Sequence, residues 1–159
     1  MVLLVCKHSH MNQRIIHNFI WVPIFLIGVV VLAFGFIWAF HPEPWLIDKP
    51  PNEALLQTTF KNLFLHKINK FLPSYLIVIY RFFGLWLITI GLLVLSYVKV
   101  TKLGTKHARY LIHSTLFLTL ISMYYLIFKH LPSSPLIPVL YVFSFLLGLS
   151  IYFSSRITE

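Results

Sequence analysis

The sequence contains few charged residues and very few acidic ones. Asp and Glu account for 4 of 159 residues, all charged residues together make up 11%, and Cys6 is the one cysteine. A soluble globular domain carries about 25% charged residues, so this composition excludes an ordinary water-soluble fold. A single cysteine forms no internal disulfide, and no Cys/His spacing matches a structural zinc site. We interpret Cys6 as an ordinary thiol, with palmitoylation near the membrane as the alternative.

Apolar residues dominate what is present. The chain is 58% hydrophobic, with a mean hydropathy of +0.84, and its length leaves no room for a separate soluble domain. We therefore predict a single membrane domain over residues 1–159. The formal net charge of +9 comes from basic residues between the apolar stretches. Such residues favour contact with anionic lipid headgroups, and we expect no nucleic-acid partner.

Four apolar stretches are long enough to cross a bilayer as helices. Each approaches the roughly 20 residues that span about 30 Å of hydrocarbon, and none shows the alternation of a membrane β-strand. The sequence thus predicts an all-α protein, a four-helix transmembrane bundle. The predicted spans are residues 19–40, 76–98, 110–129 and 136–155.

The basic residues also predict an orientation. The connection between the second and third spans, residues 99–109, carries four basic residues and no acid. The 41–72 segment also has four lysines, but three acids accompany them. The positive-inside rule then places both termini and the 99–109 connection in the cytoplasm.

The 41–72 segment has its own pattern. Its four prolines between His41 and Pro51 predict an extended, stiff stretch. Asn52 is a suitable N-cap for a helix over residues 52–72 that ends before Pro73. Leu and Phe follow one side of this helix, and Lys and Asn the other. We expect an amphipathic interfacial helix in the first outer loop, which either caps the bundle or forms a lid over a lipid-facing pocket.

Arg81 is the one charged residue inside the second span. The seventeen uncharged residues that follow it rise about 25 Å as a helix, so Arg81 lies near the outer boundary of the hydrocarbon. Our first interpretation is a snorkelling side chain or an ion pair with an acid of the outer loop. The alternative is a site for an anionic ligand. The candidate ligand-binding residues are then Arg81, Tyr80, Trp45 and Glu43.

His17 and His113 are the weak candidates for a haem site. Both are predicted to enter the membrane from the cytoplasmic side at similar depth, on the first and third spans. A pair of imidazoles can ligate haem iron, but no carboxylate is present to orient either ring. No span contains an acid, and enzyme motifs are absent. We therefore expect no cofactor, no metal site and no catalytic residues.

Small residues recur at helical spacing. Gly28 and Gly35 are seven residues apart on the first span, as are Gly84 and Gly91 on the second. A heptad offset keeps each pair on one face, which predicts close packing of these two helices. On the fourth span, Ser144 and Gly148 form a small-xxx-small pair that predicts another helix contact.

The plan of four short spans, an amphipathic piece in the first outer loop and the spacing Arg81-x-x-Gly84 resembles the small four-helix bacterial DoxX-like membrane proteins. The resemblance covers the topology and residues 81–91, and the proline-rich stretch 42–51 does not match that group. It implies a bacterial inner-membrane protein of poorly defined role, and it transfers no catalytic residue.

Three functions are compatible with these patterns. The first is a non-catalytic lipid-interacting protein or an accessory subunit of a membrane complex, since catalytic groups are missing. The second is a membrane-embedded enzyme or redox protein that acts on a lipid or quinone. The third is a small transporter or channel formed by oligomers. We favour the first.

Overall fold

The computed structural model describes the backbone of residues 2–157 and the side chains of residues 13–157, so the side chain of Cys6 lies outside the described residues. The protein is all-α, as predicted. Its long helices are α1 (Val2–Phe40), α4 (Leu72–Thr101), α5 (Lys106–His130) and α6 (Ile137–Ser154). Between α1 and α4 lie the short helices α2 (Lys49–Leu56) and α3 (Phe60–Leu65) and the 3-10 turns η1 (Pro44–Leu46) and η2 (Lys67–Asn69).

Four helical segments are long and apolar enough to cross a membrane. They are Gln13–Phe40, Lys67–Thr101, Lys106–His130 and Ile137–Ser154. Each overlaps one of the predicted spans, which makes this a polytopic membrane protein with four spans. The orientation and the single-domain organisation remain predictions.

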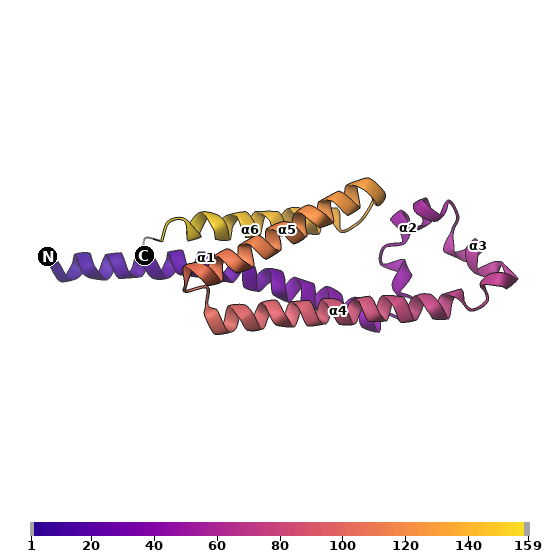
Figure 1. Ribbon diagram of the computed structural model, residues 1–159, viewed down its shortest axis with the longest axis horizontal. Helices are drawn as coiled ribbons and strands as arrows, with labels where there is room; N and C mark the ends of the chain where they lie inside the picture. The colour runs from indigo at the N-terminus through magenta and orange to yellow at the C-terminus, as the bar shows by residue number, and fades with distance from the viewer. Residues whose placement is uncertain (1, 158–159) are drawn as a thin grey trace.

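Helix α1 lies at the centre of the bundle. It packs most extensively against α4, next against α6, and α5 packs in turn against α6 (Figure 1). The turn between α4 and α5 and the C-terminal end of α6 lie at one end of the molecule, which we call the turn end. Residues 41–71 lie at the other end, the loop end.

Glycines stand at the closest approach of α1 and α4. A methyl carbon placed on Gly35 would lie 2.6 Å from the backbone nitrogen of Ile88, and one on Gly91 would lie 2.8 Å from that of Leu32. Real Cβ atoms do not approach backbone atoms so closely, so these positions require glycine. The buried residues of α4 are Gly84, Gly91 and Val98, again seven apart, while most of its other residues are exposed.

The expected continuous helix over residues 52–72 is wrong. Helix α2 ends at Leu56 because Gln57 adopts a left-handed conformation, with φ of 52°. Thr59 then caps α3, since its hydroxyl accepts a hydrogen bond from the Asn62 backbone N–H. These local caps compete with helix continuation. The apolar stripe is therefore divided among short helices.

Both ends of the expected helix also differ from the prediction. Asn52 lies inside α2, whose N-cap is Asp48. Pro50 and Pro51 occupy the first turn of α2, where the missing N–H of proline costs no helical hydrogen bond. For the same reason Pro73 lies in the first turn of α4 instead of following a helix end. The proline-rich stretch is thus not extended throughout.

The loop end has a small aromatic core. Trp45 and Phe60 are each 5% exposed, and the Trp45 ring centroid lies 5.4 Å from that of Phe64. Glu53 stabilises the break between α2 and α3, because its carboxylate accepts a hydrogen bond of 2.8 Å from the Phe60 backbone N–H. The rings hold the short helices together without a long amphipathic helix.

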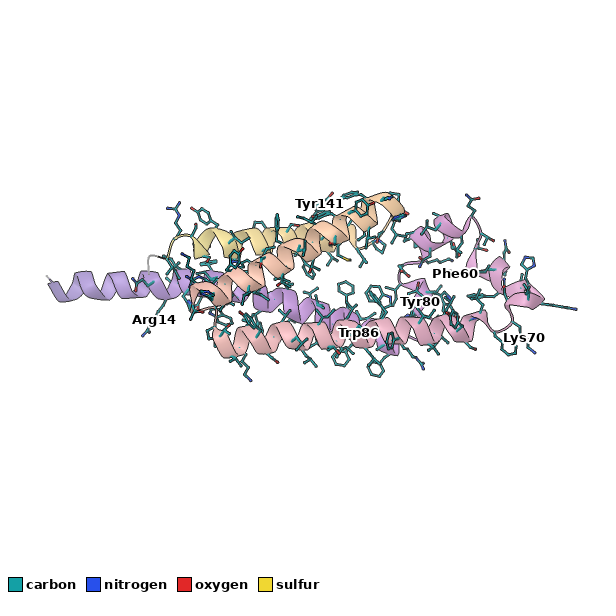
Figure 2. The ribbon with its side chains drawn as sticks, viewed as in Figure 1. Arg14, Phe60, Lys70, Tyr80, Trp86 and Tyr141 are labelled. Carbon is teal, nitrogen blue, oxygen red and sulfur yellow. The ribbon has the colours of Figure 1, made fainter. Side chains whose placement is uncertain are left out.

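One polar cluster attaches this loop to α4. The Tyr80 hydroxyl donates to the Asp48 carboxylate at 3.1 Å and accepts from the Asn52 side-chain amide at 2.9 Å. Phe60 and Tyr80 both lie at the loop end (Figure 2). Burial raises the pKa of Asp48 above its ordinary value, while the hydrogen bonds from Tyr80 and Asn52 oppose that shift.

Docking of the loop on α4 is expected to weaken as the pH rises. The docked state holds the Asp48 proton more tightly than the undocked state. Docking is therefore strongest below the ordinary carboxyl pKa and is lost in part as the pH rises through the raised pKa. Amide hydrogen exchange of residues 49–56 measures the free energy of docking. The exchange is followed between about pH 4 and about pH 8 and corrected for the intrinsic exchange rate at each pH. In the Asp48→Asn variant the free energy of docking should not change with pH. The same pH dependence in that variant as in the wild type would show that Asp48 is not the group responsible.

Candidate functional site

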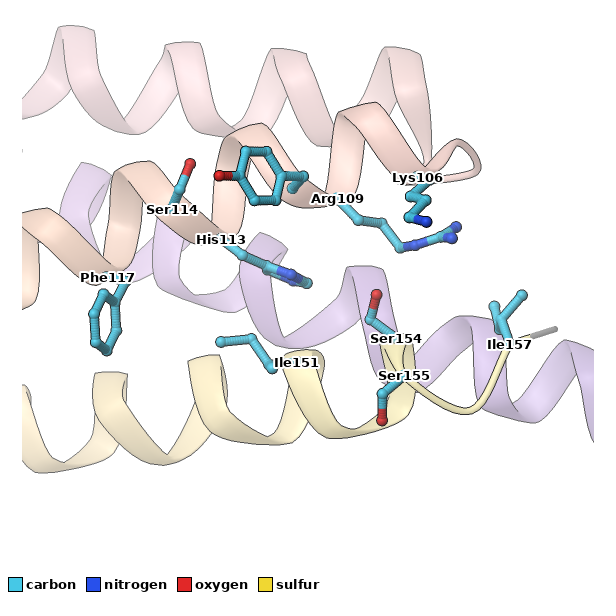
Figure 3. A pocket seen from close by; sticks show the side chains of 10 residues that line it. Lys106, Arg109, His113, Ser114, Phe117, Ile151, Ser154, Ser155 and Ile157 are labelled. Carbon is cyan, nitrogen blue, oxygen red and sulfur yellow. The ribbon is translucent and has the colours of Figure 1, made fainter. Parts of the chain in front are cut away.

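A hollow opens between the first turns of α5 and the last turns of α6, at the turn end of the bundle (Figure 3). Its volume is about 580 Å³. We call it the polar hollow because basic and hydroxyl-bearing residues are among those that line it. The lining residues are Lys106, Arg109, Tyr110, His113, Ser114, Phe117, Ile151, Ser154, Ser155 and Ile157.

A structured turn places the cationic side of the hollow. Helix α4 ends where Lys102 and Leu103 adopt left-handed conformations, with φ of 49° and 52°. The Thr105 hydroxyl then caps α5 by accepting a hydrogen bond from the Ala108 N–H. Because Leu103 is fully buried and the Lys102 amine lies 4.5 Å from the centre of the Trp21 ring, this turn is anchored to α1.

Arg109 is buried beneath this turn. Its guanidinium Nη1 donates to the carbonyl oxygens of Leu103 and Gly104, at 3.3 and 3.0 Å, and the residue is 5% exposed. Lys106, one turn earlier, is exposed. The wall of the hollow therefore carries one buried and one exposed basic side chain.

Three helices meet at one hydrogen-bonded junction beside the hollow. The Ser150 hydroxyl of α6 donates to the Ile20 carbonyl of α1 at 2.6 Å. The same oxygen lies 2.8 Å from Nε2 of His113, on α5. A hydroxyl has one proton, and a carbonyl can only accept. Nε2 of His113 must therefore donate to Ser150, which leaves Nδ1 of the neutral ring as an acceptor.

This proton arrangement bears on catalysis. A base-activated serine donates its proton to the histidine. Here the Ser150 proton goes to Ile20 instead, and Ser150 is fully buried. The junction consequently holds helices together and orients the His113 ring; it does not present a nucleophile.

An apolar groove continues from the polar hollow along α5 and α6. It has a volume of about 200 Å³ and shares Phe117 and Ile151 with the hollow. Gly148 lies on its wall, and a methyl carbon there would meet nothing within 4 Å. Gly148 is therefore not at a close helix contact, contrary to the small-xxx-small prediction. The other lining residues are Leu120, Ile121, Tyr124, Ser144 and Leu147.

Ser144, the other residue of that predicted pair, does join two helices. Its hydroxyl lies 2.9 Å from the Tyr124 hydroxyl of α5 and donates to the Leu140 carbonyl of its own helix. This contact closes the far end of the apolar groove through hydrogen bonding instead of close backbone packing.

The two candidate haem ligands occupy different surroundings. Nε2 of His113 is bonded to Ser150, whereas His17 lines a separate small hollow with Gln13, Arg14 and Asn18. Within residues 13–157, no three His, Cys, Asp or Glu side chains come together in a group that could hold a metal ion.

The four candidate ligand-binding residues at the loop end have separate roles. Trp45 is buried against Phe60 and Phe64, and Tyr80 is engaged by Asp48 and Asn52. Glu43 is exposed, and its backbone N–H donates to the imidazole of His41. Arg81 is also exposed. Two of the acids proposed as partners of Arg81 contact other residues. Asp48 accepts a hydrogen bond from Tyr80, and Glu53 lies 3.8 Å from the Lys49 amine.

Reasoning from the sequence missed Lys106 and Arg109, which line the hollow, and Ser150, which lies in the junction beside it. A signal was present. Arg109 precedes His113 by four residues on α5, and Ser150 precedes Ser154 by four on α6. That spacing places each pair on one helix face. Two polar faces at the same end of neighbouring spans indicate a shared site.

Comparison with known protein families, with curated proteins and with solved structures finds no match. The four apolar helices are consistent with a small four-helix membrane protein, and no family match supports the resemblance to DoxX-like proteins.

Proposed function

We propose that this is a non-catalytic, lipid-interacting membrane protein whose ligand lies in the polar hollow and the apolar groove between α5 and α6. The observation that carries the proposal is the continuity of the two: Phe117 and Ile151 line both. Cations and hydroxyls lie at the helix ends, and an apolar wall runs from them toward the middle of the spans. A phospholipid has the same order of groups, a polar headgroup followed by an apolar acyl chain.

The membrane setting supports the same proposal. Phospholipid headgroups lie at the ends of membrane-spanning helices and their chains run along them. The hollow begins at the first turn of α5, and the groove extends to Tyr124, about 27 Å of helix rise from Lys106. We further propose, from the positive-inside rule, that the turn end faces the cytoplasm of a bacterial cell and that the membrane is the inner membrane.

Native mass spectrometry of gently extracted protein tests the proposal. We expect a lipid adduct on the wild type. Gly148→Leu should reduce its occupancy about tenfold, because the new side chain fills the groove where the ligand chain would lie. The space around Gly148 allows this substitution without displacing a helix.

Ala33→Leu is the control, since it introduces a leucine at an exposed position of α1. It should leave the adduct unchanged. A lipid-free wild type, or equal adducts on wild type and Gly148→Leu, would contradict the proposal. A co-purifying protein on the wild type would indicate the accessory-subunit role in addition.

A further inference from the structure

Helix α4 extends past the loop-side end of α1. The two helices meet at Gly84, where a methyl carbon would lie 2.5 Å from the Ala39 backbone nitrogen, and α1 ends at the next residue, Phe40. Because the exposed Glu43 follows this end, α1 ends near the edge of the hydrocarbon. From Gly84 to its first residue, Leu72, α4 rises about 18 Å. One headgroup layer is about 5–8 Å thick, so the segment before Leu72 lies beyond the headgroups of the protein's own membrane.

Residues 61–71, which we call the tip, present apolar side chains at this outermost position. Helix α3 and the turn after it lie at the far end of the molecule (Figure 1), and Lys70 lies beyond Tyr80 (Figure 2). The turn is held by its own hydrogen bonds, since the Asn69 side-chain amide donates to the Leu63 carbonyl at 2.8 Å. Apolar side chains gathered on such an ordered, exposed turn indicate an interaction surface. The most exposed are Leu65, Ile68 and Phe71, at 73%, 92% and 76%.

The charge of the tip has one sign. Lys61, Lys67 and Lys70 belong to it, and residues 61–71 include no acid. Among the side chains of residues 13–157, none lies within ion-pair distance of these three lysines, whereas Lys49 pairs with Glu53. The Lys70 amine lies 5.6 Å from the centre of the Phe71 ring, so a cation lies directly beside an exposed apolar side chain. Apolar side chains together with uncompensated positive charge are the combination that binds anionic lipid surfaces.

We propose that the tip docks on an anionic lipid bilayer that lies opposite the protein's own membrane, with Leu65, Ile68 and Phe71 inserted between its lipids. Protruding side chains favour a bilayer over a folded partner, because fluid lipid admits them in any arrangement and a protein needs a complementary surface. A second copy of the chain is disfavoured, since lysines would face lysines. The protein would then connect two membranes. The polar hollow lies at the opposite end of the molecule, so docking does not depend on a ligand there.

Vesicle binding by the full-length protein in phosphatidylcholine nanodiscs tests the proposal. The vesicles contain either equimolar phosphatidylglycerol and phosphatidylcholine or phosphatidylcholine alone. The anionic vesicles should bind about tenfold more tightly or better, since each lysine near an anionic surface contributes about fivefold. Ile68→Ser should weaken this binding about tenfold through lost apolar burial, and Lys67→Gln about fivefold. Val100→Ser and Lys99→Gln are the controls, because both residues are exposed near the turn end of α4, and neither should change binding.

An environment-sensitive fluorophore on Ile68→Cys, in a chain that also carries Cys6→Ser, reports where the tip lies. Its emission should shift to shorter wavelength when anionic vesicles are added and not before. Four results would overturn the proposal. A shifted emission before vesicles are added would show that the tip lies in the protein's own bilayer. Equal binding to the two kinds of vesicle would remove the role of charge, and equal binding by the wild type and both tip variants would place the contact elsewhere. A shift in native membrane fragments, but with neither kind of vesicle, would show that a protein covers the tip.

Discussion

Replacing Gly84 with alanine is expected to lower the free energy of unfolding by about 1–3 kcal/mol, the usual cost of overpacking a tight contact. A methyl carbon at this position would lie 2.5 Å from the Ala39 backbone nitrogen and 2.8 Å from the Gly35 carbonyl oxygen. Both are backbone atoms of α1, so no side-chain rotation relieves the clash. The helices must separate along the most extensive contact in the protein. Denaturing-detergent titration in mixed micelles measures the loss.

Two glycines supply the controls for that experiment. Gly28→Ala should cost less, because its methyl would meet the flexible side chain of Leu95 at 3.0 Å. Gly148→Ala should leave the free energy of unfolding unchanged or raise it by up to about 1 kcal/mol, since its surroundings are open and alanine has the higher helix propensity. Equal losses for Gly84→Ala and Gly148→Ala would contradict this account, because a methyl group at Gly148 meets no atom within 4 Å.

Ser150→Ala is expected to cost about 1–2 kcal/mol. The substitution removes the hydroxyl that links α1, α5 and α6, and it leaves the Nε2 proton of His113 without a partner inside the bundle. Helix α5 packs against the bundle mainly through α6. The first turns of α5 should consequently exchange amide hydrogens faster in this variant.

Ser155→Ala is the control at the C-cap of the same helix. The Ser155 hydroxyl is exposed and donates to the Tyr152 carbonyl of α6. The free energy of unfolding should stay within about 0.5 kcal/mol of the wild type. If both alanine variants behave alike, the three-helix junction contributes no stability.

The features that the sequence predicts well are those determined by residues close together in it. The four spans follow from unbroken apolar stretches, and lipid requires such stretches to be helical. The spacing of Gly28, Gly35, Gly84 and Gly91 likewise points to the face on which α1 and α4 meet. Neither feature depends on knowing which distant residues come together.

The features that could not be predicted depend on local hydrogen bonds that compete with a helix, or on contacts between residues far apart in the sequence. Residues 52–72 have the pattern of an amphipathic helix, but the left-handed Gln57 and the Thr59 cap interrupt it. Ser150 and Ile20 are 130 residues apart, and Asp48 and Tyr80 are 32 apart. Nothing in the local pattern of one residue indicates the other. The sequence suggests His17 and His113 as a pair of haem ligands, whereas His113 forms a hydrogen bond with Ser150.

The candidate site lies at the turn end, whereas the sequence points to Arg81 at the loop end. Arg81 is distinctive in the sequence because it interrupts a span, but its side chain is exposed. Lys106 and Arg109 look like ordinary topogenic residues, yet with His113 they form one wall of the polar hollow. The basic residues on which the predicted orientation depends thus also line the hollow.

Photocrosslinking with a phospholipid that carries a photoreactive acyl chain tests the central claim most directly. Labelled peptides are identified by mass spectrometry from protein in lipid bilayers. The proposed site predicts labelling concentrated in residues 106–124 and 144–157, well above the labelling of residues 78–93 of α4, most of which are exposed. Uniform labelling of α4 and of α5–α6 would contradict it, because the chain would then be bulk lipid and not a bound ligand.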